Sequence, residues 1–264
     1  MQIDLKGLRA LVTGSTSGIG KATARRLAES GAEVVINGRT ADRVQATIAE
    51  IAASVPSAKL VAASGDISTA EGCGRVIEAA GEIDILVNNA AWIGFKPAFE
   101  IPDEDWTKIY EVNVLAGVRL TRHYGPIMKD KGWGRIVFIS SESGIQIPTE
   151  MIHYGFSKAA ELAVSRGFAQ ALKGTGVTVN AVLPGPTRTE ALIGFVKRQA
   201  EERGVSEAQV EQDFLNNARP TGLLGRFTTP DEIANVVAFV CSKEASAISG
   251  TPLRADGGVV QAIT

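Results

Sequence analysis

The sequence predicts an α/β fold in which helices cover both faces of one doubly wound, parallel, seven-stranded sheet. Two observations predict it. Short β-branched apolar segments alternate along the chain with longer stretches that have helical spacing, which is the pattern of βα units. Most of the short segments are apolar at every position, as expected for strands that are buried on both faces.

Seven segments have the composition of strands. They cover residues 8–13, 33–37, 59–63, 83–88, 135–140, 177–182 and 252–254. Helical spacing is found at about residues 20–30, 41–53, 69–80, 103–129, 151–173 and 230–242. Start signals support three of these helices, because Thr69, Pro102 and Thr229 each stand directly before an acidic or proline-led first turn.

The whole chain, residues 1–264, is expected to form one domain, because no linker, charge block or internal repeat marks a boundary. Residues 187–228 are the exception to the alternation. They are helix-prone and charged, and they separate the sixth strand from the last long helix. Such an insert is more typical of a mobile cover over a site than of a sheet element.

Composition excludes several classes of partner. The 27 Lys and Arg residues against 29 Asp and Glu residues leave no excess of cations for a nucleic acid. No apolar run approaches the ~18 residues of a membrane span, and the first residues lack the pattern of a signal peptide, so we expect a cytoplasmic protein. The only cysteines and histidines, Cys73, Cys241, His123 and His153, form no metal-binding or disulfide motif, so we expect no metal.

A glycine-rich turn follows the first predicted strand, with the sequence Thr13-Gly14-Ser15-Thr16-Ser17-Gly18-Ile19-Gly20. Gly14 and Gly18 permit a tight turn, and the helix that follows offers free N–H groups to an anion such as a pyrophosphate. Gly20 allows this helix to lie close to the sheet. A turn of small residues that serves packing alone is the alternative, but the position at the start of a βαβ unit favours a dinucleotide.

Tyr154 and Lys158 stand four residues apart, so that on a helix they share one face. A neighbouring ammonium lowers the pKa of a phenol from about 10, which makes the pair suitable for general acid and base catalysis. A packing tyrosine beside a solvated lysine is the ordinary alternative. This helix, however, begins just beyond the carboxyl end of the fifth strand, at the edge where parallel sheets bind ligands.

Further motifs extend this pattern along the chain. They are Asp66, Asn88-Asn89-Ala90, Asn113, Ser141 and Pro184-Gly185-Pro186-Thr187-Arg188-Thr189. In order and spacing the whole set resembles the short-chain dehydrogenase/reductase family. The resemblance implies a Rossmann fold and an NAD(P)-dependent oxidoreductase that transfers a hydride between nicotinamide and a carbonyl or secondary alcohol. Ala91 departs from the family pattern, which has glycine there.

The resemblance implies a catalytic set of Asn113, Ser141, Tyr154 and Lys158. Tyr154 would be the general acid or base, and Ser141 would bind the substrate oxygen and stabilise developing negative charge. Asn113 would hold a water that relays protons to Lys158. Ser140 is the rival to Ser141, because only one of two successive strand side chains can face the cleft. The spacing to Tyr154 and Gly144 selects Ser141.

The resemblance also implies which residues bind the cofactor. They are Gly14, Ser15, Ser17, Gly18, Ile19, Gly20, Arg39, Asp66, Ile67, Asn89, Tyr154, Lys158, Pro184, Gly185, Thr187 and Thr189. The second strand ends in Gly38 and Arg39, where an NAD enzyme carries an acid, and a guanidinium there can bind a 2′-phosphate. NADP(H) is therefore favoured over NAD(H). A solvated Arg39, with Ser17 at the family's other basic position, is the alternative.

The sequence does not identify the substrate. Segments that border the cleft carry Trp92, Phe95, Ile145, Ile147, Met151, Ile193 and Phe195, and an apolar wall suits a ketone or an acyl thioester equally. Within the family, the leading interpretation is a 3-oxoacyl thioester reductase, which resembles 3-oxoacyl-[acyl-carrier-protein] reductase. A sugar, a steroid or another small ketone are the competitors. We interpret His153, Glu142 and Glu150 as supporting or solvated residues.

Two further expectations concern partners and the alternative function. The family implies a homotetramer, with residues 151–173 and 248–260 as contacts. A non-catalytic NADP(H)-binding redox sensor on the same fold is the alternative to an enzyme, because one architecture supports many functions. The intact set of Tyr154, Lys158, Ser141 and Asn113 favours the enzyme.

Overall fold

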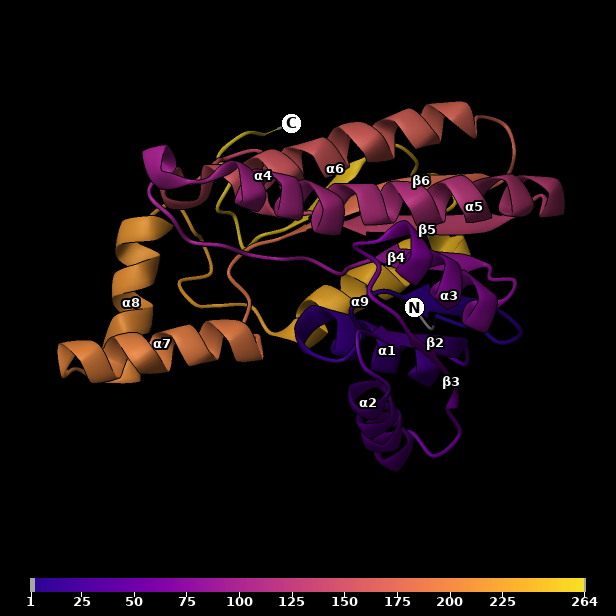
Figure 1. Ribbon diagram of the computed structural model, residues 1–264, viewed down its shortest axis with the longest axis horizontal. Coiled ribbons are helices and arrows are strands. Elements are labelled where there is room, and N and C mark those ends of the chain that lie inside the picture. Colours follow the sequence, from indigo (N-terminus) through magenta and orange to yellow (C-terminus); the bar gives the residue numbers. More distant parts are fainter. Residues whose placement is uncertain (1–2, 264) are drawn as a thin grey trace.

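The parallel sheet has seven strands, as predicted (Figure 1). Their order in the sheet is β3-β2-β1-β4-β5-β6-β7. The computed structural model describes residues 3–263. The strands are β1 (Arg9–Val12), β2 (Glu33–Gly38), β3 (Lys59–Ser64), β4 (Ile85–Asn88), β5 (Gly134–Ile139), β6 (Val177–Pro184) and β7 (Pro252–Ala255). The chain order reverses beside β1, which pairs with β2 on one side and β4 on the other. Such a reversal opens a crevice at the carboxyl ends of the strands.

Each central strand contributes to two apolar cores, because successive side chains point to opposite faces. In β1, Ala10 and Val12 belong to the first core and Leu11 belongs to the second. Three helices pack on the first face: α1 (Gly18–Glu29), α2 (Ala41–Ser54) and α9 (Pro230–Val240). Three others pack on the second face: α3 (Ala70–Ala80), α5 (Ala116–Lys131) and α6 (Ile152–Ala171). Helices thus cover both faces, which confirms the predicted fold class.

Local signals begin the helices where the sequence predicts. Thr229 accepts a hydrogen bond from Glu232 N at 3.3 Å, and Glu232 Oε2 accepts one from Thr229 N at 2.8 Å, which forms a complete capping box before α9. Thr69 caps α3 by accepting from Gly72 N at 3.0 Å. Among residues 3–263, no helix has both the length and the apolar character that crossing a membrane requires.

The helix predicted over residues 103–129 is interrupted, and this prediction was wrong in its middle. The structure has α4 (Asp103–Ile109), then a π-helical turn (Tyr110–Leu115), and then α5. Asn113 lies in the wide turn and bonds the Trp92 backbone twice, accepting from its N at 2.7 Å and donating to its O at 3.0 Å. A π turn carries one more residue than an α turn, and such turns occur often at functional sites.

The insert, residues 187–228, folds into α7 (Glu190–Arg203) and α8 (Glu207–Ala218). Figure 1 shows both helices projecting from the body that contains the sheet. Thr187 and Thr228 form an isolated parallel bridge, and their hydroxyl oxygens lie 2.9 Å apart. The insert therefore leaves and rejoins the body at one point.

Candidate active site

One cleft runs along the carboxyl ends of the strands. Its volume is about 1610 Å³, larger than the roughly 300–1,000 Å³ of a pocket for a drug-sized ligand, which leaves room for a dinucleotide beside a second molecule. Every site residue predicted from the sequence lines this cleft except Ser15 and Asn113. The chain thus brings together residues from the first strand to the insert.

The glycine turn between β1 and α1 leaves no room for side chains. Gly14 and Gly18 have φ of +61° and +53°, in the left-handed region that favours glycine. A Cβ on Gly20 would lie 2.3 Å from Asn89 Nδ2 and 2.5 Å from Gly14 O. Backbone therefore approaches the cleft closely at the N-terminus of α1, which fits the pyrophosphate of a dinucleotide.

Ser15 supports this turn from behind. It is fully buried, and its hydroxyl accepts a hydrogen bond from Asn37 N at 2.9 Å. Asn37 Oδ1 in turn accepts from Gly14 N at 3.1 Å. The side chain of Ser15 is therefore engaged with β2, and Thr16, which the sequence reasoning did not select, lines the cleft in its place.

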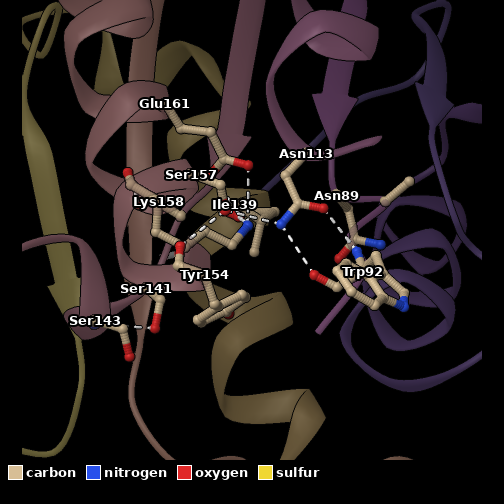
Figure 2. Close-up of polar contacts among 12 residues, drawn as sticks. Asn89, Trp92, Asn113, Ile139, Ser141, Ser143, Tyr154, Ser157, Lys158 and Glu161 are labelled. Atoms are coloured by element: carbon tan, nitrogen blue, oxygen red, sulfur yellow. Dashed lines mark hydrogen bonds and ion pairs between the residues drawn. The ribbon is translucent and has the colours of Figure 1, made fainter. Parts of the chain in front are cut away.

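Tyr154, Lys158 and Ser141 gather where the turn after β5 meets α6 (Figure 2). A Cβ on Gly144 would lie 2.8 Å from the carbonyl carbon of Lys158, so this turn rests directly on the helix. Lys158 Nζ lies 5.7 Å from the centre of the Tyr154 ring. Ser140 donates its hydroxyl hydrogen to Lys158 O at 2.8 Å, so its side chain is engaged with the backbone of α6.

Asn113 lies behind the cleft rather than in it. Its amide donates to Ser157 Oγ at 2.9 Å in addition to its two bonds with Trp92, as Figure 2 shows. The side chain therefore ties the loop after β4 to α6. Its role in a proton relay stays a prediction.

The chain is similar over its length to known oxidoreductases. A family model described as enoyl-(acyl carrier protein) reductase matches residues 14–260. The protein named uncharacterized oxidoreductase YvaG of Bacillus subtilis (strain 168) is 45% identical over 265 residues, which is 100% of both chains. The chain belongs to the short-chain dehydrogenase/reductase family.

Two other members of the family have more specific names. D-beta-hydroxybutyrate dehydrogenase of Rhizobium meliloti (strain 1021) is 33% identical over 94% of this chain and 97% of that protein. The crystal structure of L-sorbose reductase from Gluconobacter frateurii, complexed with NADPH and L-sorbose, matches with a TM-score of 0.94 and 30% identity over 100% of both chains. This short-chain dehydrogenase/reductase is therefore an NAD(P)-dependent oxidoreductase.

The pKa of Tyr154 is raised, and the expectation that Lys158 lowers it was wrong. Burial raises the pKa of this phenol most, and the negative charges of Glu142 and Glu161 raise it further. The neighbouring Ser141 hydroxyl and the Arg219 guanidinium lower the pKa by less. Lys158 cannot dominate, because its own charge is compensated by a carboxylate.

That carboxylate belongs to Glu161, one turn further along α6. Lys158 Nζ donates to Glu161 Oε1 and Oε2 at 2.9 and 3.1 Å and to Ile139 O at 2.8 Å. Burial raises the pKa of Glu161, while the ion pair with Lys158 lowers it. The sequence reasoning missed Glu161, although an acid three residues after Lys158 on a buried helix face was a usable signal.

Glu142 is a buried part of the site rather than a solvated residue. Its carboxylate accepts a hydrogen bond from the Ser141 hydroxyl through Oε2. Its other oxygen, Oε1, accepts from Arg219 Nε at 2.7 Å. Arg219 follows α8 in the insert, so this ion pair joins the insert to the residue next to Ser141. No sequence spacing predicted the contact.

The end of the cleft beside β2 carries two arginines. Arg39 follows β2 directly, and Arg43 lies in the first turn of α2. Both side chains are exposed, so their charges are free to meet a phosphate group. Arg43 was missed, because Arg39 precedes α2 and no helical spacing links the two residues.

A carboxylate occupies the N-terminus of α1. Glu190 Oε2 accepts a hydrogen bond from Gly18 N at 2.8 Å, and its Oε1 lies 3.5 Å from Lys21 Nζ. Glu190 is the first residue of α7. The insert therefore contacts the glycine turn through Glu190, in addition to contacting Glu142 through Arg219. Although burial opposes it, the backbone N–H groups and Lys21 keep the pKa of Glu190 below its usual value.

His153, beside Tyr154, is fully buried among aromatic rings. Its ring centre lies 5.8 Å from that of Trp92 and 6.0 Å from that of Trp106. Neither ring nitrogen has a hydrogen-bond partner within residues 3–263. Burial lowers the pKa of His153, so the imidazole serves as a neutral packing group in agreement with a supporting role.

Proposed function

We propose that this enzyme reduces a small carbonyl compound with NADPH, and oxidises the corresponding secondary alcohol, with Tyr154 as the proton donor or acceptor. One observation carries the proposal: Tyr154, Ser141 and Lys158 converge at the cleft that the glycine turn opens. The nicotinamide, when bound, supplies the hydride. The protein positions the substrate oxygen at Ser141 and delivers the proton.

Tyr154 holds the proton that reduction requires, because its phenol is protonated at neutral pH. The raised pKa makes it a weaker acid than a free phenol, so the proton transfer depends on the position of Tyr154 in the cleft and not on an acidified hydroxyl. Lys158 is held by Glu161 and Ile139 O in a fixed position one turn away, where it would bind the nicotinamide ribose. Thr187 and Thr189 line the same cleft and would fix the carboxamide.

NADP(H) is the cofactor that we propose. Arg39 and Arg43 present two guanidinium groups at the end of β2, where Gly38 leaves no acid to bind a free ribose hydroxyl. The related L-sorbose reductase structure contains NADPH. The two named relatives act on different compounds by their names, so the substrate class is argued from the cleft itself, below.

We also propose a homotetramer in the cytoplasm, with α6 and residues 248–260 as contacts. Phe156, on α6, is 42% exposed, which is apolar surface that a second copy would cover. Light scattering after size exclusion tests the assembly, and a monomer would refute it.

Tyr154→Phe tests the proposed chemistry. The variant keeps the ring but cannot donate a proton, so NADPH consumption with a turned-over ketone should fall by about 10²- to 10⁴-fold while NADPH still binds. Tyr110→Phe, at an exposed tyrosine, is the matched control. Turnover that survives Tyr154→Phe would refute the proposed role.

A further inference from the structure

A buried ion pair stands in the substrate end of the cleft, beside the catalytic serine. Glu142 and Arg219 are 4% and 9% exposed, and both line the cleft. They lie 77 positions apart in the sequence, and Arg219 Nε donates to Glu142 Oε1 at 2.7 Å. Burying two charges carries a large desolvation cost, and apolar residues of similar size would pack the same space equally well. Packing therefore does not explain why this pair is charged.

The hydrogen-bonding capacity of the pair is only partly used. Arg219 Nη1 donates to Ala218 O at 2.7 Å, while Nη2 has no acceptor within residues 3–263. Each carboxylate oxygen of Glu142 accepts one bond and has a lone pair left. The pair therefore presents a free donor next to free acceptors.

The charges of this region select among ligand classes. The pair is neutral as a unit, and Glu150 lies 3.9 Å from Arg219 Nη1 as a further negative charge. A substrate carboxylate or phosphate would face two carboxylates and only one guanidinium, which is already paired, so an anionic group does not match this region. A wholly apolar acyl chain or steroid would cover the free donor and acceptors without replacing their bonds, which is unfavourable. Hydroxyl groups donate to a carboxylate and accept from a guanidinium, so they match.

Aromatic rings also line the cleft. Phe95 and Phe195 stack with ring centres 5.7 Å apart and planes 10° apart, and both line the cleft. Arg219 lies over Phe214, 5.8 Å from its ring centre. A flat apolar wall with a few placed polar groups suits a compact molecule that has C–H groups on one side and hydroxyls on the other.

We propose that Glu142 and Arg219 form a subsite that recognises hydroxyl groups, so that the substrate is a small polyhydroxylated ketone or its alcohol. This inference rests on the proposed function. The Ser141 hydroxyl has one hydrogen, which it donates to Glu142. A substrate carbonyl takes this hydrogen in place of Glu142, so the hydroxyl on the neighbouring carbon can donate to the carboxylate oxygen that is released. In the reduction, the carbonyl carbon accepts a hydride from NADPH and its oxygen accepts a proton from Tyr154, which gives a secondary alcohol and NADP⁺.

Matched ketones test the substrate class. We would compare kcat/KM for 1,3-dihydroxyacetone and D-fructose with that for acetone, cyclohexanone and an acetoacetyl thioester. A site built to bond hydroxyls should prefer the hydroxylated ketones by at least about 100-fold. Faster turnover of the thioester or of the plain ketones would overturn the inference and leave the proposed function standing.

Arg219→Leu tests the subsite. It should lower kcat/KM for the hydroxylated ketone by about 10- to 100-fold more than it lowers kcat/KM for the matched plain ketone. Arg219→Lys, which keeps the charge, should recover part of the loss. Arg226→Leu, at an exposed arginine that pairs with Glu232, is the matched control. An equal loss for both ketones would show a structural role only and overturn the inference.

A binding measurement separates the two proposals. Calorimetry with NADP⁺-saturated enzyme and D-sorbitol should show binding that Arg219→Leu weakens about tenfold or more. If no ketone is reduced but this binding is seen, the proposed function fails and the subsite stands. If D-sorbitol does not bind and plain ketones are reduced, the subsite fails and the function stands. If neither binding nor reduction is seen, both fail.

Discussion

Lys158 Nζ donates to both carboxylate oxygens of Glu161, at 2.9 and 3.1 Å, where the two side chains are 2% and 3% exposed. The ammonium of Lys158 is therefore paired within its own helix. The negative charge of Glu161 also reaches Tyr154 and raises the pKa of the phenol. Under the proposed function, Glu161 would act on the reaction through Lys158 and Tyr154, as a positioning residue.

Glu161→Gln should move the pH dependence of alcohol oxidation toward lower pH. Oxidation needs the phenolate of Tyr154, and removing a negative charge beside the phenol lowers its pKa. The acidic limb of log kcat against pH should therefore shift to lower pH. The glutamine amide oxygen can still accept a hydrogen bond from Lys158, so the position of the ammonium is kept. Glu78→Gln, at an exposed glutamate on α3, is the matched control. A profile that does not move would contradict the coupling.

Arg39→Ala and Arg43→Ala should each weaken NADPH binding by about tenfold and leave NADH binding unchanged. The physical reason is the loss of a charge-assisted hydrogen bond to the 2′-phosphate, which NADH lacks. Fluorescence titration of both cofactors measures the ratio. Arg122→Ala, at an exposed arginine outside the cleft, is the control. A double variant that keeps its preference for NADPH would exclude these arginines.

Glu190→Gln should tighten cofactor binding by about two- to fivefold, as expected for one charge at a helix N-terminus. The carboxylate holds Gly18 N and approaches Lys21, where a cofactor phosphate is expected, so removing its charge relieves repulsion. The gain should shrink at high salt. Glu207→Gln, in the first turn of α8 and outside the cleft, should have no effect. Weaker binding by Glu190→Gln would instead mean that the carboxylate supports the bound state.

The free energy of unfolding should fall as the pH drops below about 6.5, in part through His153. Burial lowers the pKa of this imidazole in the folded chain below its ordinary value of 6.5. The unfolded chain therefore binds the proton more readily, so the contribution is complete above pH 6.5 and is lost as the pH falls below it. Urea titrations at several pH values should show a smaller loss for His153→Phe than for the wild type. His123→Gln, at an exposed histidine, should behave like the wild type.

Local patterns were enough to predict the sheet and most helices. The strands β4, β5 and β6 are buried at every position, so their apolar runs identified them. The π-helical turn was not predicted, because the apolar spacing of a helix continues through residues 103–129. Asn113, within this turn, bonds to the Trp92 backbone 21 positions away, and no local spacing records such a contact.

The same limit applies to the site. Tyr154 and Lys158 lie four positions apart, so the sequence was enough to predict that they share one face of a helix. Gly18 and Glu190 lie 172 positions apart, and Glu142 and Arg219 lie 77 apart. No local spacing records such contacts, so the sequence suggested an apolar substrate wall and a phenol acidified by Lys158. The buried carboxylates change both conclusions.

The insert carries an apolar centre of its own, formed by Val196, Ala200, Val210 and Phe227. Helices that share such a centre can swing as one body about the Thr187 and Thr228 junction without unwinding. Uncovering the cleft then breaks the stacking of Phe195 on Phe95 and the polar contacts of Glu190 and Arg219 with the body. The backbone amides of α7 and α8 should accordingly exchange their hydrogens with solvent as one cooperative group, at rates that a bound ligand slows together.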